Sequence, residues 1–242
     1  MLPLTQLASQ VWVLPPDPDP AQVQPSVGVI CTATQTLLVD AGNGDRHARR
    51  LAEALRSIDA PPVRFVIYTH HHWDHVFGAQ QFDAAIIAHE QTHELLRGRA
   101  SEPWGQAYLA EAVAHEPRLA ASYGALGRAI ESWDTFAVRV PTITFSQRLR
   151  LHLDGLCIEL EHVGGQHAPD SIVVRVPEAG VLFLGDCFYP PPLHERGPDA
   201  KVDRAMLARF AADEAVSVYV QGHGPAASKA WLRTFLDGAS KE

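Results

Sequence analysis

Short β-branched runs alternate along the chain with longer segments whose apolar residues have helical spacing. Runs at 26–33 and 35–42 are separated by a turn-like break, which predicts an antiparallel hairpin. Residues 45–58 carry apolar positions at helical spacing and predict a helix that ends before two prolines. The apolar run at 63–69 then predicts a buried strand, so a strand–helix–strand order opens the chain.

The rest of the chain continues this alternation. The pattern predicts strands at 84–90, 143–155, 156–165, 171–177, 180–186 and 217–224, and helices at 91–99, near the end of 195–212 and over 226–239. Residues 143–155 and 156–165 should form a hairpin across Asp154-Gly155, a dipeptide suited to tight turns. The alanine-rich segment 103–134 lacks strand signals and predicts one or two helices. Strands in both halves with helices between and after them favour an α/β fold, a four-layer αββα sandwich of two mixed sheets with outer helices.

Length and composition favour one domain. The chain has 242 residues, of which 46% are hydrophobic and 20% charged, as in an ordinary globular protein. No low-complexity linker divides it, so we expect a single domain over 1–242 with a helical insert at about 99–134.

Charge and cysteine content narrow the class of partner. The net charge is −8 and the pI is about 5.9, which argues against nucleic acid and anionic membranes and leaves a small-molecule substrate. The three cysteines, Cys31, Cys157 and Cys187, are odd in number and widely spaced, which suits a reducing compartment. Without a basic, apolar leader or a run of about 18 apolar residues, the expected location is cytoplasmic.

The stretch THHHWDH at 69–75 concentrates metal-binding side chains directly after a predicted strand. If the chain stays extended, side chains alternate, so His70 and His72 point one way, His71 points away and Asp74 follows in the phase of His70. A change of direction into a helix would bring His75 back toward Asp74. Imidazole and carboxylate suit zinc, and also iron or manganese.

Three further residues end or follow predicted strands later in the chain. His167 follows a Gly-Gly turn, Asp186 ends an apolar run and His223 lies between glycines. A carboxylate at the end of a buried strand is costly unless a cation compensates it. Together with the first cluster, these residues complete two three-ligand sets that share one carboxylate.

The motif HHHWDH, followed in order by GGQHAPDS, FLGDC and GHG, resembles the metallo-β-lactamase-fold hydrolase superfamily. This resemblance extends from LLVDAG to the last strand. It implies two zinc ions per chain, with Asp186 as the bridging carboxylate. The first ion would be held by His70, His72 and His167, and the second by Asp74, His75 and His223. His72 is glutamate in the di-iron flavoprotein branch, so histidine here favours zinc hydrolysis over redox chemistry.

The expected function is hydrolysis of an ester, thioester or lactone by a hydroxide held between the two ions. Asp74 would orient this nucleophile or accept its proton. Tyr189 resembles the tyrosine of the acyl-homoserine lactonase branch, whose phenol hydrogen-bonds the substrate carbonyl; packing beneath the following prolines is its alternative role. A metallonuclease or phosphodiesterase, β-lactam hydrolysis and a non-catalytic metal or redox protein are the competing functions.

Neighbouring residues receive supporting roles. Asp40 and Thr69 are expected to orient ligands, although a turn-forming aspartate is an equal alternative for Asp40. Trp73 and Phe77 are expected near the substrate, and Cys187 should point into the sheet. Core packing is expected for most aromatic residues of the insert, namely Trp104, Tyr108, Tyr123 and Trp133. Surface or structural positions are expected for His71, His89, His93, His115, His162 and His194.

Overall fold

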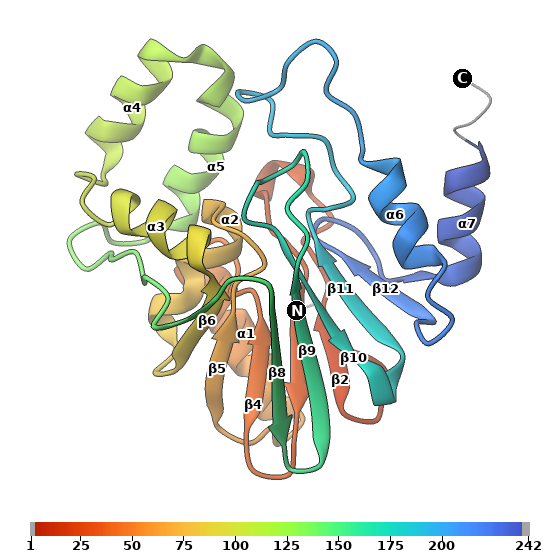
Figure 1. Cartoon of the computed structure of the whole chain (residues 1–242). Helices are drawn as coiled ribbons and strands as arrows, with labels where there is room; N and C mark the ends of the chain where they lie inside the picture. Colours follow the sequence, from red (N-terminus) through yellow and green to blue (C-terminus); the bar gives the residue numbers. More distant parts are fainter. Residues whose placement is uncertain (1–2, 239–242) are drawn as a thin grey trace.

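The computed structural model describes residues 3–238 and consists of two β-sheets packed face to face, with helices on the outside (Figure 1). The seven-stranded sheet contains, in spatial order, β1 (Thr5–Ala8), β2 (Val11–Leu14), β3 (Val27–Cys31), β4 (Thr36–Val39), β5 (Val63–Ile67), β6 (Ala85–His89) and β7 (Ile143–Phe145). The six-stranded sheet contains β13 (Ala227–Ser228), β12 (Val218–Gln221), β11 (Val181–Gly185), β10 (Ile172–Val176), β9 (Leu156–His162) and β8 (Arg148–Leu153). Both sheets mix parallel and antiparallel pairs.

Along the chain, the helices lie between and after these strands. They are α1 (Asp45–Ser57), α2 (Trp73–Val76), α3 (Glu90–Arg99), α4 (Gln106–His115), α5 (Ala120–Ala129), α6 (Arg204–Ala211) and α7 (Lys229–Gly238). Short 3-10 turns are η1 (Pro20–Gln22), η2 (Phe77–Gln81), η3 (Pro117–Leu119) and η4 (Pro177–Ala179). Among the described residues, no helix is long and apolar enough to span a membrane.

Three apolar clusters hold the layers together. Inward-facing residues of both sheets, such as Ile67 and Phe183, form the central cluster. Leu51 of α1 belongs to a second cluster outside the seven-stranded sheet, and Leu207 of α6 belongs to a third outside the six-stranded sheet. Each sheet therefore buries two apolar faces, which confirms the predicted αββα sandwich.

The segment 143–155 departs from the prediction of one continuous strand. Residues of β7 pair with β6 in the first sheet, whereas β8 pairs with β9 in the second. Ser146 and Gln147 lie between them, and the chain changes sheets there. Both halves have strand periodicity, so the pattern along the sequence could not distinguish one long strand from two short ones.

The turn between β8 and β9 was predicted correctly. Asp154 and Gly155 both have positive φ, at 50° and 84°, as a two-residue hairpin loop requires. The Asp154 carboxylate also accepts hydrogen bonds from Thr32 Oγ1 at 2.7 Å and from Thr34 N at 2.9 Å. This turn therefore connects the two sheets at the end of the molecule away from the helical insert.

The N-terminal strands β1 and β2 were not predicted. Helices were predicted in the segment 103–134, and α4, η3 and α5 lie within it. Leu109 and Leu126 of the insert belong to the same apolar cluster as Leu51 of α1. The predicted final helix is α7, and its last predicted residue, Ala239, lies outside the described residues.

Several loops meet at one end of the sandwich. Strand β5 is parallel to its neighbours, and β11 is parallel to β12, so their carboxyl ends lie at this end. Because β9 and β10 are antiparallel, the loop between them returns to the same end. Figure 1 shows α2 there, with α4, α5 and the long β11–α6 segment projecting beyond it.

Candidate metal centre

The histidine-rich stretch changes from an extended chain to a helix at His72. That residue is the extended N-cap of α2, with φ −65° and ψ 141°. Asp74 and His75 therefore lie in the first helical turn, and the amide of His75 donates to the His72 carbonyl at 3.0 Å. The expectation that alternation continues to Asp74 was wrong, because helix begins at Trp73.

Three imidazoles converge at the first set of candidate ligands. Nδ1 of His72 lies 2.9 Å from His70 Nε2 and 3.0 Å from His167 Nε2. Nitrogens sharing a tetrahedral zinc ion stand roughly 3.3 Å apart, given Zn–N bonds of about 2.0–2.1 Å. The Pro190 carbonyl can only accept, so His167 donates to it through Nδ1 at 2.9 Å and keeps the Nε2 lone pair for the cluster.

The second set combines a carboxylate with two imidazoles. Oδ2 of Asp74 lies 3.1 Å from His223 Nε2 and 3.6 Å from His75 Nε2. Outer acceptors fix both rings, because Nδ1 of His75 lies 2.7 Å from Asp40 Oδ2 and Nδ1 of His223 lies 3.3 Å from the Gln24 carbonyl. Each ring therefore turns its Nε2 toward Asp74, and that nitrogen offers a lone pair once its proton is lost.

The Asp186 carboxylate lies between the two sets. Its Oδ2 is 3.1 Å from His167 Nε2 and 3.4 Å from His223 Nε2, and its Oδ1 is 3.4 Å from His75 Nε2. Gly222 permits this approach, since a Cβ there would lie 1.8 Å from Asp186 Oδ1. One carboxylate thus faces imidazoles of both sets.

Several buried polar atoms in this cluster lack a hydrogen-bond partner, namely His72 Nε2, His75 Nε2 and Asp186 Oδ1. Buried polar atoms without partners are costly. Two of these atoms, His75 Nε2 and Asp186 Oδ1, face each other at 3.4 Å. Candidate ligand atoms lie within 4.8 Å of one another in three groups: His70, His72 and His167; His70, His75 and Asp186; and Asp74, His75 and His223. The donor types and their spacing fit divalent cations.

Asp40 supports both sets from behind. It ends β4 in a left-handed conformation, with φ 65°, and is almost fully buried. Its carboxylate accepts from the Thr69 amide at 2.8 Å, from the Thr69 hydroxyl at 2.9 Å and from His75 Nδ1 at 2.7 Å. Because the Thr69 hydroxyl donates to Asp40, it is free to accept from His70 Nδ1, which lies 3.0 Å away. One carboxylate therefore orients a histidine in each set. Asp40 does more than form a turn, which was its alternative role.

Burial keeps two imidazoles of the first set, those of His70 and His72, neutral. The pKa values of His70 and His72 both lie well below the usual 6.5, mainly because burial penalises the charged ring. Neighbouring imidazoles lower both values further. These rings present lone pairs without first losing a proton.

Carboxylates have the opposite effect on the second set. Burial alone would lower the pKa of His75, but Asp186, Asp40 and Asp74 together raise it well above 6.5. Burial also opposes the charged form of His223, yet Asp186 and Asp74 raise its pKa to about 10. In the absence of metal these two rings hold protons, and a divalent ion would have to displace them.

His71 faces away from the candidate ligands, as predicted, but it is buried. Its Nδ1 lies 2.9 Å from Asp170 Oδ1, and Thr92 Oγ1 donates to the other oxygen of that carboxylate at 2.8 Å. Asp170 is fully buried. This network connects the histidine-rich loop to α3 and to the β9–β10 loop, and Asp170 had no predicted role although it lies within the motif GGQHAPDS.

A cavity of about 240 Å³ opens beside the cluster. Its floor includes His72, Asp74, His167, Asp186 and His223. Its walls come from Val23, Trp73, Arg99, Ser122, Tyr123, residues 189–192, His194 and Arg196. This volume is slightly below the usual range of ligand pockets, about 300–1,000 Å³, and suits a small molecule.

Tyr189 lies in the cavity wall next to the second set. Its hydroxyl donates to Gln221 Oε1 at 2.8 Å and accepts from the His223 amide at 3.2 Å. Burial, followed by the charge of Asp186, raises the pKa of the phenol, so it stays protonated. A substrate oxygen would have to compete with Gln221 for this proton, and the catalytic role of Tyr189 stays a prediction.

The other aromatic residues divide between cavity and core. Trp73 lines the cavity as expected, and its indole nitrogen donates to Ser122 Oγ at 2.9 Å. Phe77 does not, because it is buried in the core against Trp104 and Phe136. Of the four aromatic residues of the insert, Tyr123 reaches the cavity, and the others pack against the core.

Cys187 and the remaining histidines mostly have structural positions. Cys187 packs beside Leu207 and Leu182, and burial raises the pKa of its thiol to about 12. His89 and His162 stack with ring centroids 3.7 Å apart. His194 is the exception, since it lines the cavity, and its position in an irregular loop gave no sign of this.

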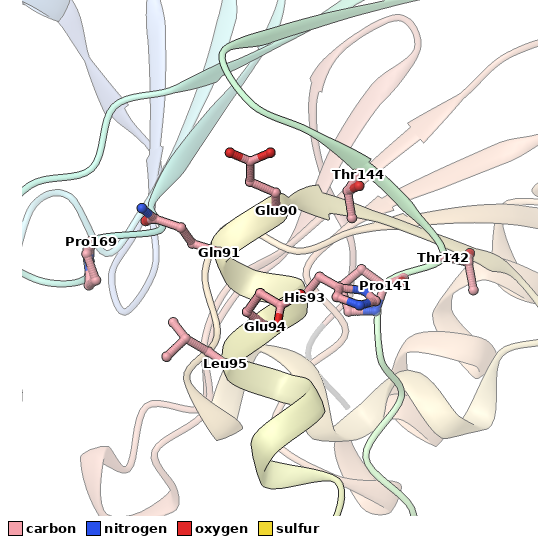
Figure 2. A pocket seen from close by; sticks show the side chains of 9 residues that line it. All are labelled: Glu90, Gln91, His93, Glu94, Leu95, Pro141, Thr142, Thr144 and Pro169. Carbon is pink, nitrogen blue, oxygen red and sulfur yellow. Dashed lines mark hydrogen bonds between the residues drawn. The ribbon is translucent and has the colours of Figure 1, made fainter.

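A larger depression of about 780 Å³ lies beside the first part of α3 (Figure 2). Glu90, Gln91 and Glu94 project from that helix, and Thr142 and Thr144 lie across from them. None of the seven candidate ligands lines it. The candidate ligands that line a cavity therefore line the smaller one.

The sequence profile of the metallo-beta-lactamase superfamily matches residues 21–227, and the chain belongs to this superfamily. The identification made from the motifs is confirmed. The fold agrees: a metallo-beta-lactamase from Pontibacter korlensis superposes with a TM-score of 0.64 at 20% identity, covering 100% of both chains.

Two characterised relatives share part of the sequence. A linear primary-alkylsulfatase from Pseudomonas sp. is 27% identical over 65% of this chain and 32% of its own length. The α subunit of a 2,4-dinitroanisole O-demethylase from Nocardioides sp. is 28% identical over 69% of this chain and 42% of its own length. The chain thus spans less than half the length of either relative.

Proposed function

We propose that this protein is a dinuclear zinc hydrolase that attacks the carbonyl carbon of an ester, thioester or lactone and breaks the bond between that carbon and the leaving oxygen or sulfur. The observation that carries the proposal is the position of Asp186, whose carboxylate faces imidazoles of both sets at 3.1–3.4 Å. A buried carboxylate among five imidazoles, with unpartnered donor atoms, is the arrangement expected of a site for two cations. Iron and manganese are alternative ions for these donors.

The residues that would hold the ions follow from the two sets. His70, His72 and His167 would hold one ion, Asp74, His75 and His223 the other, and Asp186 would contact both. Divalent ions in such a site lower the pKa of bound water to about 7 and polarise a substrate oxygen. Asp40 and Thr69 keep His70 and His75 in the tautomer that this requires.

Asp74 is the proposed proton acceptor of this chain. Its carboxylate lines the cavity, so it can reach both a nucleophilic water and a substrate. Tyr189 is the proposed donor to the carbonyl oxygen, because its phenol lies in the same wall and stays protonated. Trp73 and the prolines after Tyr189 add apolar surface to the cavity wall beside these groups.

A second candidate function is hydrolysis of a sulfate ester. The relative named as a linear primary-alkylsulfatase supports it, although that protein shares only part of its length with this chain. Metallonuclease activity has less support, since the net charge is −8 and the cavity is small.

A substrate panel on zinc-reconstituted protein tests the proposal. Lactones, thioesters and esters should be hydrolysed at rates at least tenfold above β-lactams, phosphodiesters and alkyl sulfates. A preference for alkyl sulfates would favour the second candidate, and turnover of none of these would contradict both.

Two histidine variants control this experiment. His167→Ala removes a candidate ligand and should abolish turnover, whereas His152→Ala alters an exposed histidine on β8 and should not. Equal activity of both variants would contradict the assigned site.

A further inference from the structure

Two arginines that are far apart in the sequence line the 240 Å³ cavity. Arg99 is the last residue of α3 and leads into the helical insert. Arg196 lies on the long segment between β11 and α6. The helical insert and the β11–α6 segment project from the same end of the sandwich (Figure 1), and both arginines line the cavity.

Neither guanidinium forms an ion pair with a carboxylate in the described part of the chain. By contrast, Arg97, two positions before Arg99 on the same helix, forms an ion pair with Glu94 at 2.6 Å. Arg196 donates through Nε to the Pro191 carbonyl at 3.1 Å and keeps its terminal nitrogens for other partners. Cationic groups that line a cavity without a carboxylate partner can bind an anionic ligand.

The arginines lie beside the candidate ligands without belonging to them. The floor of the cavity holds Asp74, Asp186 and three ligand histidines, where the reacting bond would bind. Tyr123, Trp73 and His194 complete the wall. A substrate long enough to fill the cavity would place its far end near the guanidinium groups.

We propose that the substrate carries an oxyanion remote from the bond that is cleaved, and that Arg99 and Arg196 bind it. This inference rests on the proposed hydrolase function and specifies its substrate class. Carboxylate, sulfonate and phosphonate share the planar or tetrahedral oxygen pattern that a guanidinium fork recognises. The protein carries a net charge of −8, so an anionic substrate needs this local positive charge.

Matched ester substrates test the inference. 4-Nitrophenyl butyrate is neutral, and the 4-nitrophenyl monoester of glutarate carries a carboxylate at the end of a similar acyl chain. Sulfonate and phosphonate analogues of the same length identify which oxyanion is preferred. The zinc-loaded wild-type protein should hydrolyse one of the anionic esters with a kcat/KM roughly tenfold above that of the neutral ester.

Arginine variants show whether the preference comes from these two residues. Arg99→Gln and Arg196→Gln should each lower the anionic-to-neutral ratio of kcat/KM by roughly threefold, mainly through KM, and the double variant should bring it near one. Arg97→Gln, on the same helix but outside the cavity wall, should keep the wild-type ratio. Loss of kcat on both esters alike would instead place the arginines at the reacting group and overturn the inference.

Calorimetry separates failure of this inference from failure of the proposed function. If no ester is hydrolysed, the hydrolase proposal fails, and titration of glutarate into zinc-loaded protein still tests the arginines. Binding should weaken roughly tenfold in the double variant and weaken with added salt. Equal glutarate binding by the double variant and the wild type, or no preference for any anionic ester, would overturn the inference.

Discussion

The two ligand sets share the carboxylate of Asp186 but have opposite proton affinities. In the first set burial dominates, and the pKa values of His70 and His72 fall well below 6.5. In the second set carboxylates outweigh burial, and the pKa of His223 rises to about 10. Both sets lie at the same end of the same two sheets, so the difference comes from the number of carboxylates near each ring.

This difference indicates how each set would accept an ion. Neutral imidazoles can bind metal without releasing protons, whereas protonated imidazoles must release theirs first. The second set also contains Asp74 and touches Tyr189, the two residues proposed to act on the substrate. The first set would therefore serve mainly as an anchor, and the second would combine metal binding with proton exchange.

The largest expected effect follows removal of the carboxylate that joins the two sets. Asp186→Ala should lower kcat/KM by about 10³-fold or more, because both sets lose a common anion. His71→Ala should cost far less, since its ring bonds to Asp170 instead of the cluster. Steady-state kinetics at equal zinc loading measure both. Comparable losses would mean that His71 has been assigned to the wrong side of the loop.

Tyr189→Phe tests the chemistry assigned to the second set. It removes the hydroxyl that would donate to the substrate oxygen and should lower turnover of the best ester by about 10²-fold. The ring remains, so folding and metal content should persist. Turnover within about threefold of wild type, with both metals bound, would leave the phenol only its contacts with Gln221 and the His223 amide.

Asp40→Asn should weaken metal binding through the residues that it orients. Its carboxylate bonds directly to His75 but reaches His70 only through Thr69. Loss of such outer partners typically costs about 10–100-fold in metal affinity, and the second set should lose more than the first. Competition with a chromophoric chelator measures both affinities. An equal loss at the two sites would contradict the direct-versus-relayed distinction.

Proton release should distinguish the sets most finely. His72→Ala leaves the second set, whose raised pKa values mean that zinc displaces protons, so its affinity should rise as the pH increases from 7 toward 10. His223→Ala leaves the first set, in which His70 and His72 are already neutral, so its affinity should change less over this range. Calorimetry in buffers of different ionisation enthalpy counts the released protons. The same count for both variants would contradict the comparison.

The sequence by itself determined the layers and selected the side chains that are candidate ligands. Strand and helix periodicities are local, so they identified most elements and the turn at Asp154-Gly155. His70, His72 and His167, and likewise Asp186, were selected because metal-binding side chains stood at predicted strand ends. Their order along the chain identified the superfamily before any distance was known.

Only the tertiary structure decided which atoms meet. Asp170 contacts His71 from 99 positions away, and no local pattern marks such a pair. The division of 143–153 between two sheets and the core position of Phe77 depend on how neighbouring layers pack. Arg99 and Arg196 share a cavity wall because the end of α3 and the irregular β11–α6 segment both reach the same cavity. Periodicity records which face of an element is buried, whereas contacts between distant segments arise only when the layers pack together.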